Sequence, residues 1–315
     1  MRKIISGSVT TEENNMKLES FLKNRLHLTK NEISRAKFLE NGICVNGRRS
    51  RVNTLLKTGD LVEILLEGSD STSPNLTALK ESLTVLYEDE DVIVVDKPAG
   101  ISVHPAGGKD TDTLANRLVF YLRNKGEDSV IRIFGRLDKD TSGVVLAVKN
   151  RPAATRLERQ REDGSLFKSY LAVTENIPAP AIGTISAPIG NDPENRKQMR
   201  IAADGKTAVT HYETLAANEE FALVRLSLET GRTHQIRVHM AHAGCPLLGD
   251  PLYGNGTSKN FSSNSFPTIK RTALHAESIH FLQPFTGREL LIEAPLPDDM
   301  RLYLSKVIGI SDDSF

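Results

Sequence analysis

A polar, turn-rich segment that runs directly into an apolar strand pattern constrains this chain more than any other feature. The segment is residues 135–149, with the sequence GRLDKDTSGVVLAVK. Carboxylates and hydroxyls fill it from Asp138 to Gly143, whereas Val144 to Val148 is a β-branched run that predicts a buried strand. A loop anchored to a core strand holds its acidic side chains in place, and catalytic residues tend to lie on such loops. The same string also fits an ordinary turn, so its meaning depends on the rest of the chain.

The size and composition fit a globular protein of two domains. The chain has 315 residues, of which 39% are hydrophobic and 25% charged. No apolar run approaches the roughly 18 residues that span a bilayer, and the N-terminus lacks the apolar segment of a secretory signal. Cys44 and Cys245 provide neither a disulfide framework nor a zinc signature. These features predict a cytoplasmic protein without a membrane partner.

The formal net charge is zero, from 40 basic and 40 acidic residues, but the charge is unevenly distributed. Residues 17–67 contain ten Lys or Arg against six Asp or Glu, a net charge of +4. Residues 68–315 contain 28 against 32, a net charge of −4. A basic module joined to a mildly acidic body indicates that the module binds a polyanion.

The basic module has the pattern of a compact α/β unit. Thr29 and Glu32 have the spacing of a capping box, and Gly42 is placed to end the helix that follows. Asn46-Gly47 is the strongest short signal for a hairpin. Basic residues gather around the predicted helix and hairpin: Arg25, Lys30, Arg35, Lys37, Arg48, Arg49 and Arg51. Together they favour an anion-facing surface.

The segment SRAKFLENGICVNGRRSRV, closed by KTGDLVEI, resembles the S4 RNA-binding domain. We therefore expect a small α/β S4-like domain over residues 16–67. The resemblance implies docking on structured RNA through shape and phosphate contacts. The RNA-binding residues implied in this domain are Arg25, Lys30, Arg35, Lys37, Arg48 and Arg49.

Two further segments are rich in turn-forming and polar residues. Residues 68–83 are predicted to be a linker, and a second domain of short strands and loops begins at residue 84. Gly254 to Ser265 is expected to be a mobile surface insertion. Between them, residues 91–96 form a second predicted core strand.

The stretch from Glu229 to His239 combines an arginine with a local alternation of polar and apolar residues. The alternation around Val238 predicts a strand with Gln235 and Arg237 on one face. An arginine beside a loop aspartate makes a charge-assisted pair. The sequence therefore indicates such a pair between Arg237 and a loop aspartate.

Spacing alone does not choose among the carboxylates Asp96, Asp138 and Asp140. The three histidines between residues 234 and 242 have neither the spacing of paired zinc ligands nor an interleaved Glu. The sequence also lacks a phosphate-binding Gly-rich loop, and Ser142 lacks a glycine-flanked elbow. These features favour carboxylate-led catalysis without a metal or other cofactor.

Several long segments, in order, resemble the RluA-type pseudouridine synthases. GRLDKDTSG is similar to their catalytic loop, FKSYLAV to their tyrosine strand, and TGRTHQIRVHMAHAGCPLLGDPLYG to their third motif. DKPAGISVHP and LHAESIHF fit the flanking elements. The resemblance implies an α+β fold with a mixed, largely antiparallel central sheet over residues 84–306. It also implies isomerisation of uridine to pseudouridine in structured RNA without a cofactor.

Carried over position by position, the resemblance implies a catalytic aspartate at Asp138 and its partner at Arg237. It places the tyrosine that stacks on the base and abstracts a proton at Tyr170. Arg136 corresponds to the residue that helps displace the target nucleotide from its helix. Gly135 stands where the family usually has His, and this leaves any contact of that His open.

The predicted substrate is large-subunit ribosomal RNA, because members with an S4 module generally modify it; transfer RNA is the alternative. No obligate protein partner is implied. Two other classes remain open: a non-catalytic RNA-binding or ribosome-assembly factor, and a glycosidase or nuclease with two carboxylates, such as Asp138 and Asp140. A minor departure from the family is Gln283, which replaces a common His before Pro284.

Overall fold

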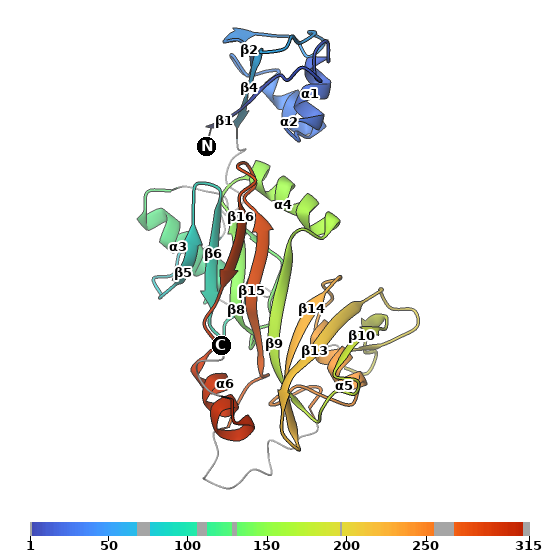
Figure 1. The fold of residues 1–315 in the computed structure, drawn as a ribbon. Coiled ribbons are helices and arrows are strands. Elements are labelled where there is room, and N and C mark those ends of the chain that lie inside the picture. Colours follow the sequence, from blue (N-terminus) through green and yellow to red (C-terminus); the bar gives the residue numbers. More distant parts are fainter. Residues whose placement is uncertain are drawn as a thin grey trace.

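The computed structural model describes residues 2–67, 76–105, 112–127, 131–195, 197–254 and 268–310. These residues form a small N-terminal unit at one end and a larger part built around a long sheet (Figure 1). None of the helices within these ranges has the length and apolar character that a membrane crossing requires.

The N-terminal unit is a four-stranded antiparallel sheet packed against two helices. Its strands, in the spatial order β1-β4-β2-β3, are β1 (Arg2–Ser8), β4 (Leu61–Glu67), β2 (Ile43–Val45) and β3 (Arg48–Arg49). Its helices are α1 (Leu18–Asn24) and α2 (Lys30–Ala36). A cluster including Phe21, Ile33 and Ile64 fills the space between sheet and helices. The sheet includes β1, which lies before the boundary predicted at residue 16.

Local sequence signals account for most of this unit. The capping box is present, since Thr29 Oγ1 accepts from Glu32 N at 3.1 Å and the Glu32 carboxylate accepts from Thr29 N at 2.7 Å. Asn46-Gly47 forms the predicted hairpin, with φ of 51° and 72°. The role predicted for Gly42 was wrong, because α2 ends earlier. A Cβ on Gly42 would lie 1.9 Å from the carbonyl oxygen of Ala36, so close backbone approach requires the glycine.

The larger part contains one mixed sheet in which nearly all neighbours are antiparallel. Its main path, in spatial order, is β10 (Ile182–Ser186), β13 (Val209–Ala217), β14 (Phe221–Leu228), β9 (Phe167–Glu175), β15 (Leu274–Leu282), β8 (Ser142–Val148), β6 (Val92–Lys97) and β5 (Thr84–Glu88). Off this path, β16 (Glu289–Glu293) pairs with β15 and β7 (Arg132–Phe134) with β8. Only β15 and β8 run parallel among the described pairs. The predicted fold class is confirmed.

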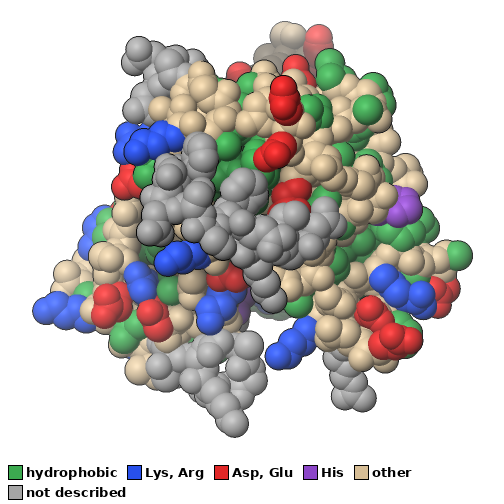
Figure 2. All heavy atoms as spheres, turned by 90° about the horizontal axis from the view of Figure 1, so that it is seen from below, with side chains coloured by type: hydrophobic (Ala, Val, Ile, Leu, Met, Phe, Trp, Pro, Cys, Tyr) green, Lys and Arg blue, Asp and Glu red, His purple; other side chains and the backbone are tan. Residues whose placement is uncertain are grey.

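Helices and a small hairpin surround the sheet. The helices are α3 (Leu114–Asn124), α4 (Arg151–Asp163), α5 (Gln235–His242) and α6 (Asp298–Tyr303), which continues into a π-helical turn, η2 (Leu304–Ile308). The hairpin pairs β11 (Ile189–Asn191) with β12 (Met199–Ile201). At the end of the molecule opposite the N-terminal unit, basic and acidic side chains are interspersed (Figure 2).

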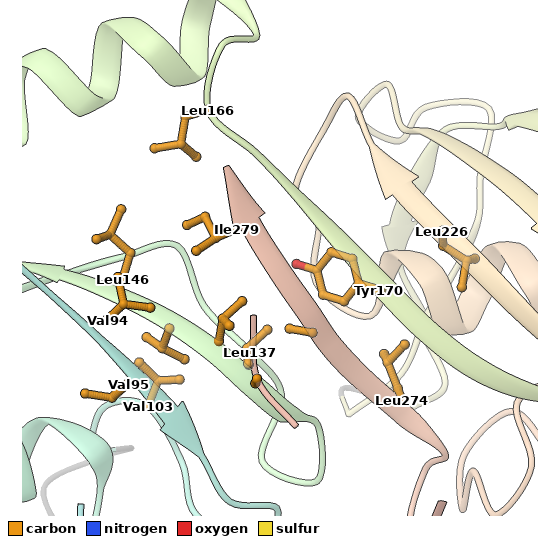
Figure 3. Packing of buried hydrophobic residues seen from close by; sticks show 14 of the residues in the cluster. Val94, Val95, Val103, Leu137, Leu146, Leu166, Tyr170, Leu226, Leu274 and Ile279 are labelled. Carbon is orange, nitrogen blue, oxygen red and sulfur yellow. The ribbon is translucent and has the colours of Figure 1, made fainter. Parts of the chain in front are cut away.

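The core lies around β8, whose seven residues are all buried. This confirms the strand predicted from the run Val144 to Val148. Leu146 of β8 packs with Val94 of β6 and Ile279 of β15 in one cluster, which also contains Tyr170 of β9 (Figure 3). The loop before β8 is therefore attached to the most deeply buried strand of the molecule.

The predicted linker and insertion lie partly outside the described residues. Residues 76–83 are described, and they are hydrogen-bonded to α3: Asn116 Nδ2 donates to the Thr77 carbonyl at 2.7 Å and Arg117 Nη1 to the Ser82 carbonyl at 3.0 Å. This half of the predicted linker therefore follows the surface of the larger part. Residues 68–75 and 255–265 belong to the segments that are not described.

The two parts of the chain meet at a polar interface next to α4. Arg156 lies between them: its Nη1 is 3.2 Å from Glu32 Oε1, and its guanidinium lies 4.6 Å from the Phe285 ring centroid. Lys3 of β1 pairs with the buried carboxylate of Asp91. Phe285 packs against the cores of both parts. These contacts join the N-terminal unit to the larger part at defined points.

An ion pair between the partly buried Glu88 and the buried Lys149 joins β5 to the residue that follows β8. The Glu88 carboxylate accepts from Lys149 Nζ at 2.6 Å, Lys125 Nζ at 2.9 Å and Tyr121 Oη at 2.7 Å. Burial alone raises the pKa of Glu88, but the hydrogen bonds from these donors outweigh it and lower the pKa from 4.5 to about 2. The stability that this carboxylate contributes is therefore present above about pH 4.5 and is lost as the pH falls toward 2.

We expect Glu88→Gln to lower the free energy of unfolding by about 2 to 3 kcal/mol at neutral pH, because Lys149 loses its main partner. The gap between wild type and variant should narrow below about pH 4.5, where the wild-type carboxylate begins to protonate in the unfolded state. Urea denaturation at neutral pH and near pH 3.5 measures both quantities. A gap that stays the same at both pH values would contradict this assignment.

Candidate active site

The segment singled out in the sequence forms a loop that precedes β8. Leu137 is buried in the main core, and the next side chain, Asp138, is 19% exposed. Thr141 N donates to the Asp138 carbonyl at 3.2 Å, and Thr141 is itself buried. Gly135 has a φ of +78°, in the left-handed region that favours glycine. The loop therefore anchors Leu137 in the core while Asp138 remains accessible.

A buried lysine attaches this loop to the end of β6. Lys97 Nζ donates to the carbonyls of Lys139, Pro98 and Ile101 at 3.0, 3.0 and 2.9 Å. Burial lowers the pKa of this amine to about 8, although the nearby carboxylates of Asp140 and Asp138 oppose the shift. Lys97 thus connects two loops beside Asp138, a role that the sequence did not reveal.

Arg237 brings α5 into contact with the loop. Its Nη1 lies 3.1 Å from Asp138 Oδ2, and its Nε and Nη2 bind the two carboxylate oxygens of Asp250 at 2.6 and 2.8 Å. Burial alone lowers the pKa of the Arg237 guanidinium, but Asp250 and Asp138 outweigh it and raise the pKa. The guanidinium is therefore a permanent positive charge, shared between a fixed carboxylate and a more accessible one.

The strand predicted around residues 235–239 was wrong, because these residues belong to helix α5. Gln235 Nε2 and His239 Nδ1 both contact Thr210 Oγ1 on β13, at 3.1 and 2.9 Å. Residues four apart share one face of a helix, whereas a strand would place them too far apart for this contact. The alternation around Val238 was too short to separate the two periodicities.

Asp250 is a part of the site that sequence reasoning missed. Its side chain is fully buried, and it also accepts from the backbone N–H groups of Leu252 and Tyr253 at 2.9 and 3.2 Å. These bonds fix the carboxylate, which in turn orients both nitrogens of the Arg237 fork. Its only sequence signal was its position in the quoted stretch ending GDPLYG.

His234 and Tyr253 line the side of Asp138 next to α5. His234 Nε2 is 3.8 Å from Asp138 Oδ2, and its Nδ1 is 2.9 Å from the Tyr253 hydroxyl. Burial lowers the pKa of this histidine more than the charge of Asp138 raises it, so neutral imidazole is favoured. The Tyr253 ring lies 5.1 Å from the Arg237 guanidinium. Of His234 and Arg237, it is therefore Arg237 that presents a positive charge to Asp138.

Tyr170 of β9 carries a buried phenol whose pKa is affected by the Asp138 carboxylate. Its side chain is 8% exposed and belongs to the main core cluster (Figure 3). Burial, and after it the negative charge of Asp138, raise the pKa of the phenol. Tyr170 is therefore a neutral phenol that lies near enough to Asp138 to be influenced by its charge.

Three further residues considered in the sequence, Arg136, Asp96 and Asp140, do not bond to Arg237 in the described residues. Arg136 is exposed on the loop beside Asp138. The carboxyl of Asp96, on β6, has a pKa raised by burial, and the Asp140 carbonyl accepts from Arg271 Nη1 at 3.2 Å. Of the three rival carboxylates, Asp138 is the one that bonds to Arg237. Within the described residues no group of three or more His, Cys, Asp or Glu side chains is arranged as a metal site.

The basic side chains predicted to bind RNA lie on the N-terminal unit, and all six are exposed: Arg25, Lys30, Arg35, Lys37, Arg48 and Arg49. Arg25 Nε is 3.5 Å from Glu13 Oε1, which partly offsets its charge. Arg49 Nη2 donates to the Lys37 carbonyl at 3.0 Å. The structure therefore separates this basic surface from the carboxylate site of the larger part.

Comparison with known proteins shows the family of the chain. Residues 91–242 match the family model for RNA pseudouridylate synthase. The chain is 40% identical over 261 residues to the uncharacterized RNA pseudouridine synthase YhcT of Bacillus subtilis (strain 168), an alignment covering 82% of this chain and 83% of that protein. It is 38% identical over 268 residues to ribosomal large subunit pseudouridine synthase D of Xanthomonas campestris pv. campestris, with 83% and 80% covered.

A solved structure shares the fold of the larger part. Human RNA pseudouridylate synthase domain containing 4 superposes with a TM-score of 0.56 at 25% identity, covering 70% of this chain and 91% of the human chain. The chain therefore belongs to the RNA pseudouridine synthase family, and it is an isomerase. Within that family it is an RluA-type pseudouridine synthase, as its motifs predicted.

Proposed function

We propose that this enzyme modifies uridine in large-subunit ribosomal RNA, with Asp138 as the catalytic carboxylate. The observation that carries the catalytic assignment is the 3.1 Å ion pair between Asp138 and Arg237, whose guanidinium is fixed from behind by the buried Asp250. The ribosomal RNA assignment is supported by several relatives whose names state that substrate, including the one from Xanthomonas campestris. This substrate would place the enzyme in the cytoplasm.

The chemistry requires a negative oxygen beside a displaced nucleoside. Isomerisation breaks the N1–C1′ bond, turns the uracil, and joins C5 to C1′; the proton on C5 leaves and N1 gains one. The Asp138 carboxylate acts at C1′ or C6, by attack or by electrostatic assistance to bond cleavage. Arg237 Nη1 donates a hydrogen bond to Asp138 Oδ2 and so fixes the orientation of this carboxylate. The reaction is redox-neutral.

Tyr170 is proposed to stack on the flipped uracil and to direct its hydroxyl toward the sugar edge. The raised pKa of its phenol favours a neutral ring, which suits stacking and hydrogen bonding. For Tyr170 to abstract a proton from the substrate, its phenol would have to give its own proton to another base in the same step. Arg136, exposed on the same loop, is proposed to occupy the position that the target nucleotide leaves.

The substrate proposal is tested by mapping pseudouridine in all RNA of cells that lack the protein. At least one site in large-subunit ribosomal RNA should lose its pseudouridine and regain it when the wild-type protein is supplied. The Asp138→Asn protein should not restore it. Loss confined to transfer RNA would show that the substrate assignment is wrong.

The N-terminal unit is proposed to be an S4-like domain that docks on RNA. Its support is the exposed basic surface around α2 and β3, together with the net positive charge of residues 17–67. Arg156 of the larger part pairs with Glu32 of the N-terminal unit, and Lys3 of the N-terminal unit pairs with Asp91 of the larger part. These contacts support a defined separation between the basic surface and Asp138. A bound RNA would therefore contact both the basic surface of the N-terminal unit and the Asp138 site.

Replacing both Arg35 and Arg49 by Ala is expected to weaken binding to a large-subunit ribosomal RNA transcript and to flatten its salt dependence. Each lost phosphate contact reduces the slope of log K against log salt by about 0.7 to 0.9. Filter binding between about 50 and 200 mM salt measures the slope. The matched control is Lys270→Ala, an exposed cation of the larger part. An unchanged slope in the double variant would refute docking through this surface.

A further inference from the structure

The N-terminal unit exposes one aromatic ring at the end of α2. Phe38 is 86% exposed, the largest value among the exposed large hydrophobic side chains of the described residues. It lies in the turn that follows the helix, where Phe38 N donates to the Arg35 carbonyl at 3.1 Å. The backbone of this turn is thus attached to α2, while the ring projects into solvent. Because the phenyl ring is exposed, its hydrophobic surface is not buried against other residues of the chain.

Three cations lie near Phe38 in the sequence or beside its turn. Lys37 precedes it, Arg35 lies one helical turn back, and the Arg49 guanidinium is held beside the turn by its 3.0 Å bond to the Lys37 carbonyl. Glu19, on α1, is an acidic side chain whose pKa is lowered first by Lys23 and more weakly by Lys37. Glu19 is already paired with Lys23 at 2.7 Å, so the cations next to Phe38 retain a positive excess.

We propose that Phe38 is a stacking platform for an unpaired base of the bound RNA, with the neighbouring cations on the flanking phosphates. This inference rests on the RNA-docking role proposed above and names the feature of RNA that the unit recognises. An aromatic face interleaved with Arg and Lys is the combination that binds a base splayed out of a helix. A paired duplex would offer its phosphates to the cations but no free base face to the ring. The unit therefore prefers RNA with a bulge or loop to a continuous duplex.

The test compares two RNA hairpins that differ by a single bulged adenosine, bound by the full-length Asp138→Asn protein so that no turnover intervenes. Adding Phe38→Ala should weaken binding of the bulged hairpin roughly five- to hundredfold, the range expected for one stacked base. Binding of the continuous hairpin should change little, and the salt slope should stay the same because no charge is removed. Phe38→Tyr should retain the affinity, whereas Phe38→Leu should lose most of it, because Leu has no ring.

Two controls separate this proposal from the one on which it rests. Ile4→Ala removes another exposed apolar side chain, 63% exposed on β1, and should leave both affinities unchanged. Arg49→Gln should lower the salt slope for both hairpins. If Arg49→Gln acts as expected but Phe38→Ala does not weaken the bulged hairpin, stacking is wrong and RNA docking stands. If neither substitution matters, docking fails as well; equal losses on both hairpins would also overturn stacking.

Discussion

Replacing Asp138 by Asn should abolish pseudouridine formation, with a fall in the single-turnover rate of at least about a thousandfold. Asn has nearly the same shape and can still accept the hydrogen bond from Arg237, which in the wild type joins Nη1 to Oδ2 over 3.1 Å. What it lacks is the negative charge that must face the nucleoside when the N1–C1′ bond breaks. The measurement is the rate of pseudouridine formation in a large-subunit ribosomal RNA transcript at saturating enzyme.

The matched control for this change is Asp140→Asn, two residues along the same loop. Asp140 binds Arg271 through its backbone carbonyl, a contact that the substitution keeps. We expect its rate to stay within about tenfold of the wild type, because the carboxylate that bonds to Arg237 is that of Asp138. Affinity for the RNA should be retained in both variants. Equal loss of rate in the two variants would mean that loop charge, and not Asp138 itself, matters.

The second large effect is expected for Arg237→Met, which should impair both catalysis and folding. The substitution leaves the fully buried carboxylate of Asp250 without a cation, and such a loss destabilises proteins by about 3 to 5 kcal/mol. It also removes the charge that orients Asp138, so the rate should fall at least about a hundredfold. Urea denaturation and single-turnover kinetics measure the two effects separately.

Two further variants show whether the losses of stability and rate in Arg237→Met come from the missing charge or from the missing bidentate geometry. Arg237→Lys keeps the charge but lacks the fork that binds Asp250 through two nitrogens, so it should regain part of the stability and little of the rate. Arg117→Met removes another arginine with two bonds to one carboxylate, that of Asp112, which is 47% exposed and lies next to α3. It should destabilise the protein by about 1 kcal/mol without affecting the rate. If Arg237→Met behaves like Arg117→Met, Arg237 has no role in the site.

Short-range signals in the sequence predicted local structure well. The capping box of Thr29 and Glu32, the Asn46-Gly47 hairpin and the buried strand Val144 to Val148 are all present. Each depends on residues within a few positions, or on the preference of a β-branched run for a buried strand. The pairing of Asp138 with Arg237 was also expected, but from family resemblance.

Contacts between distant segments were harder to predict. Strand β1 exists because it has β4 to pair with, almost sixty residues later in the chain. The helix over residues 235–242 is selected by contacts with Thr210, which override a short alternating pattern. The local sequence around Asp250 does not reveal its partner, because that partner is the Arg237 guanidinium packed against it in the fold. Such features depend on partners whose proximity only the folded chain establishes.

By itself the sequence determined the family, the loop that carries the aspartate, and the alternation of polar turns with buried strands. Only the tertiary structure decided which second carboxylate fixes Arg237, and where the basic unit lies relative to the arginine and the aspartate. The physical reason is that a residue's type and neighbours set its local conformation. Its charge partners and burial are set by segments that folding brings together across the whole length of the chain.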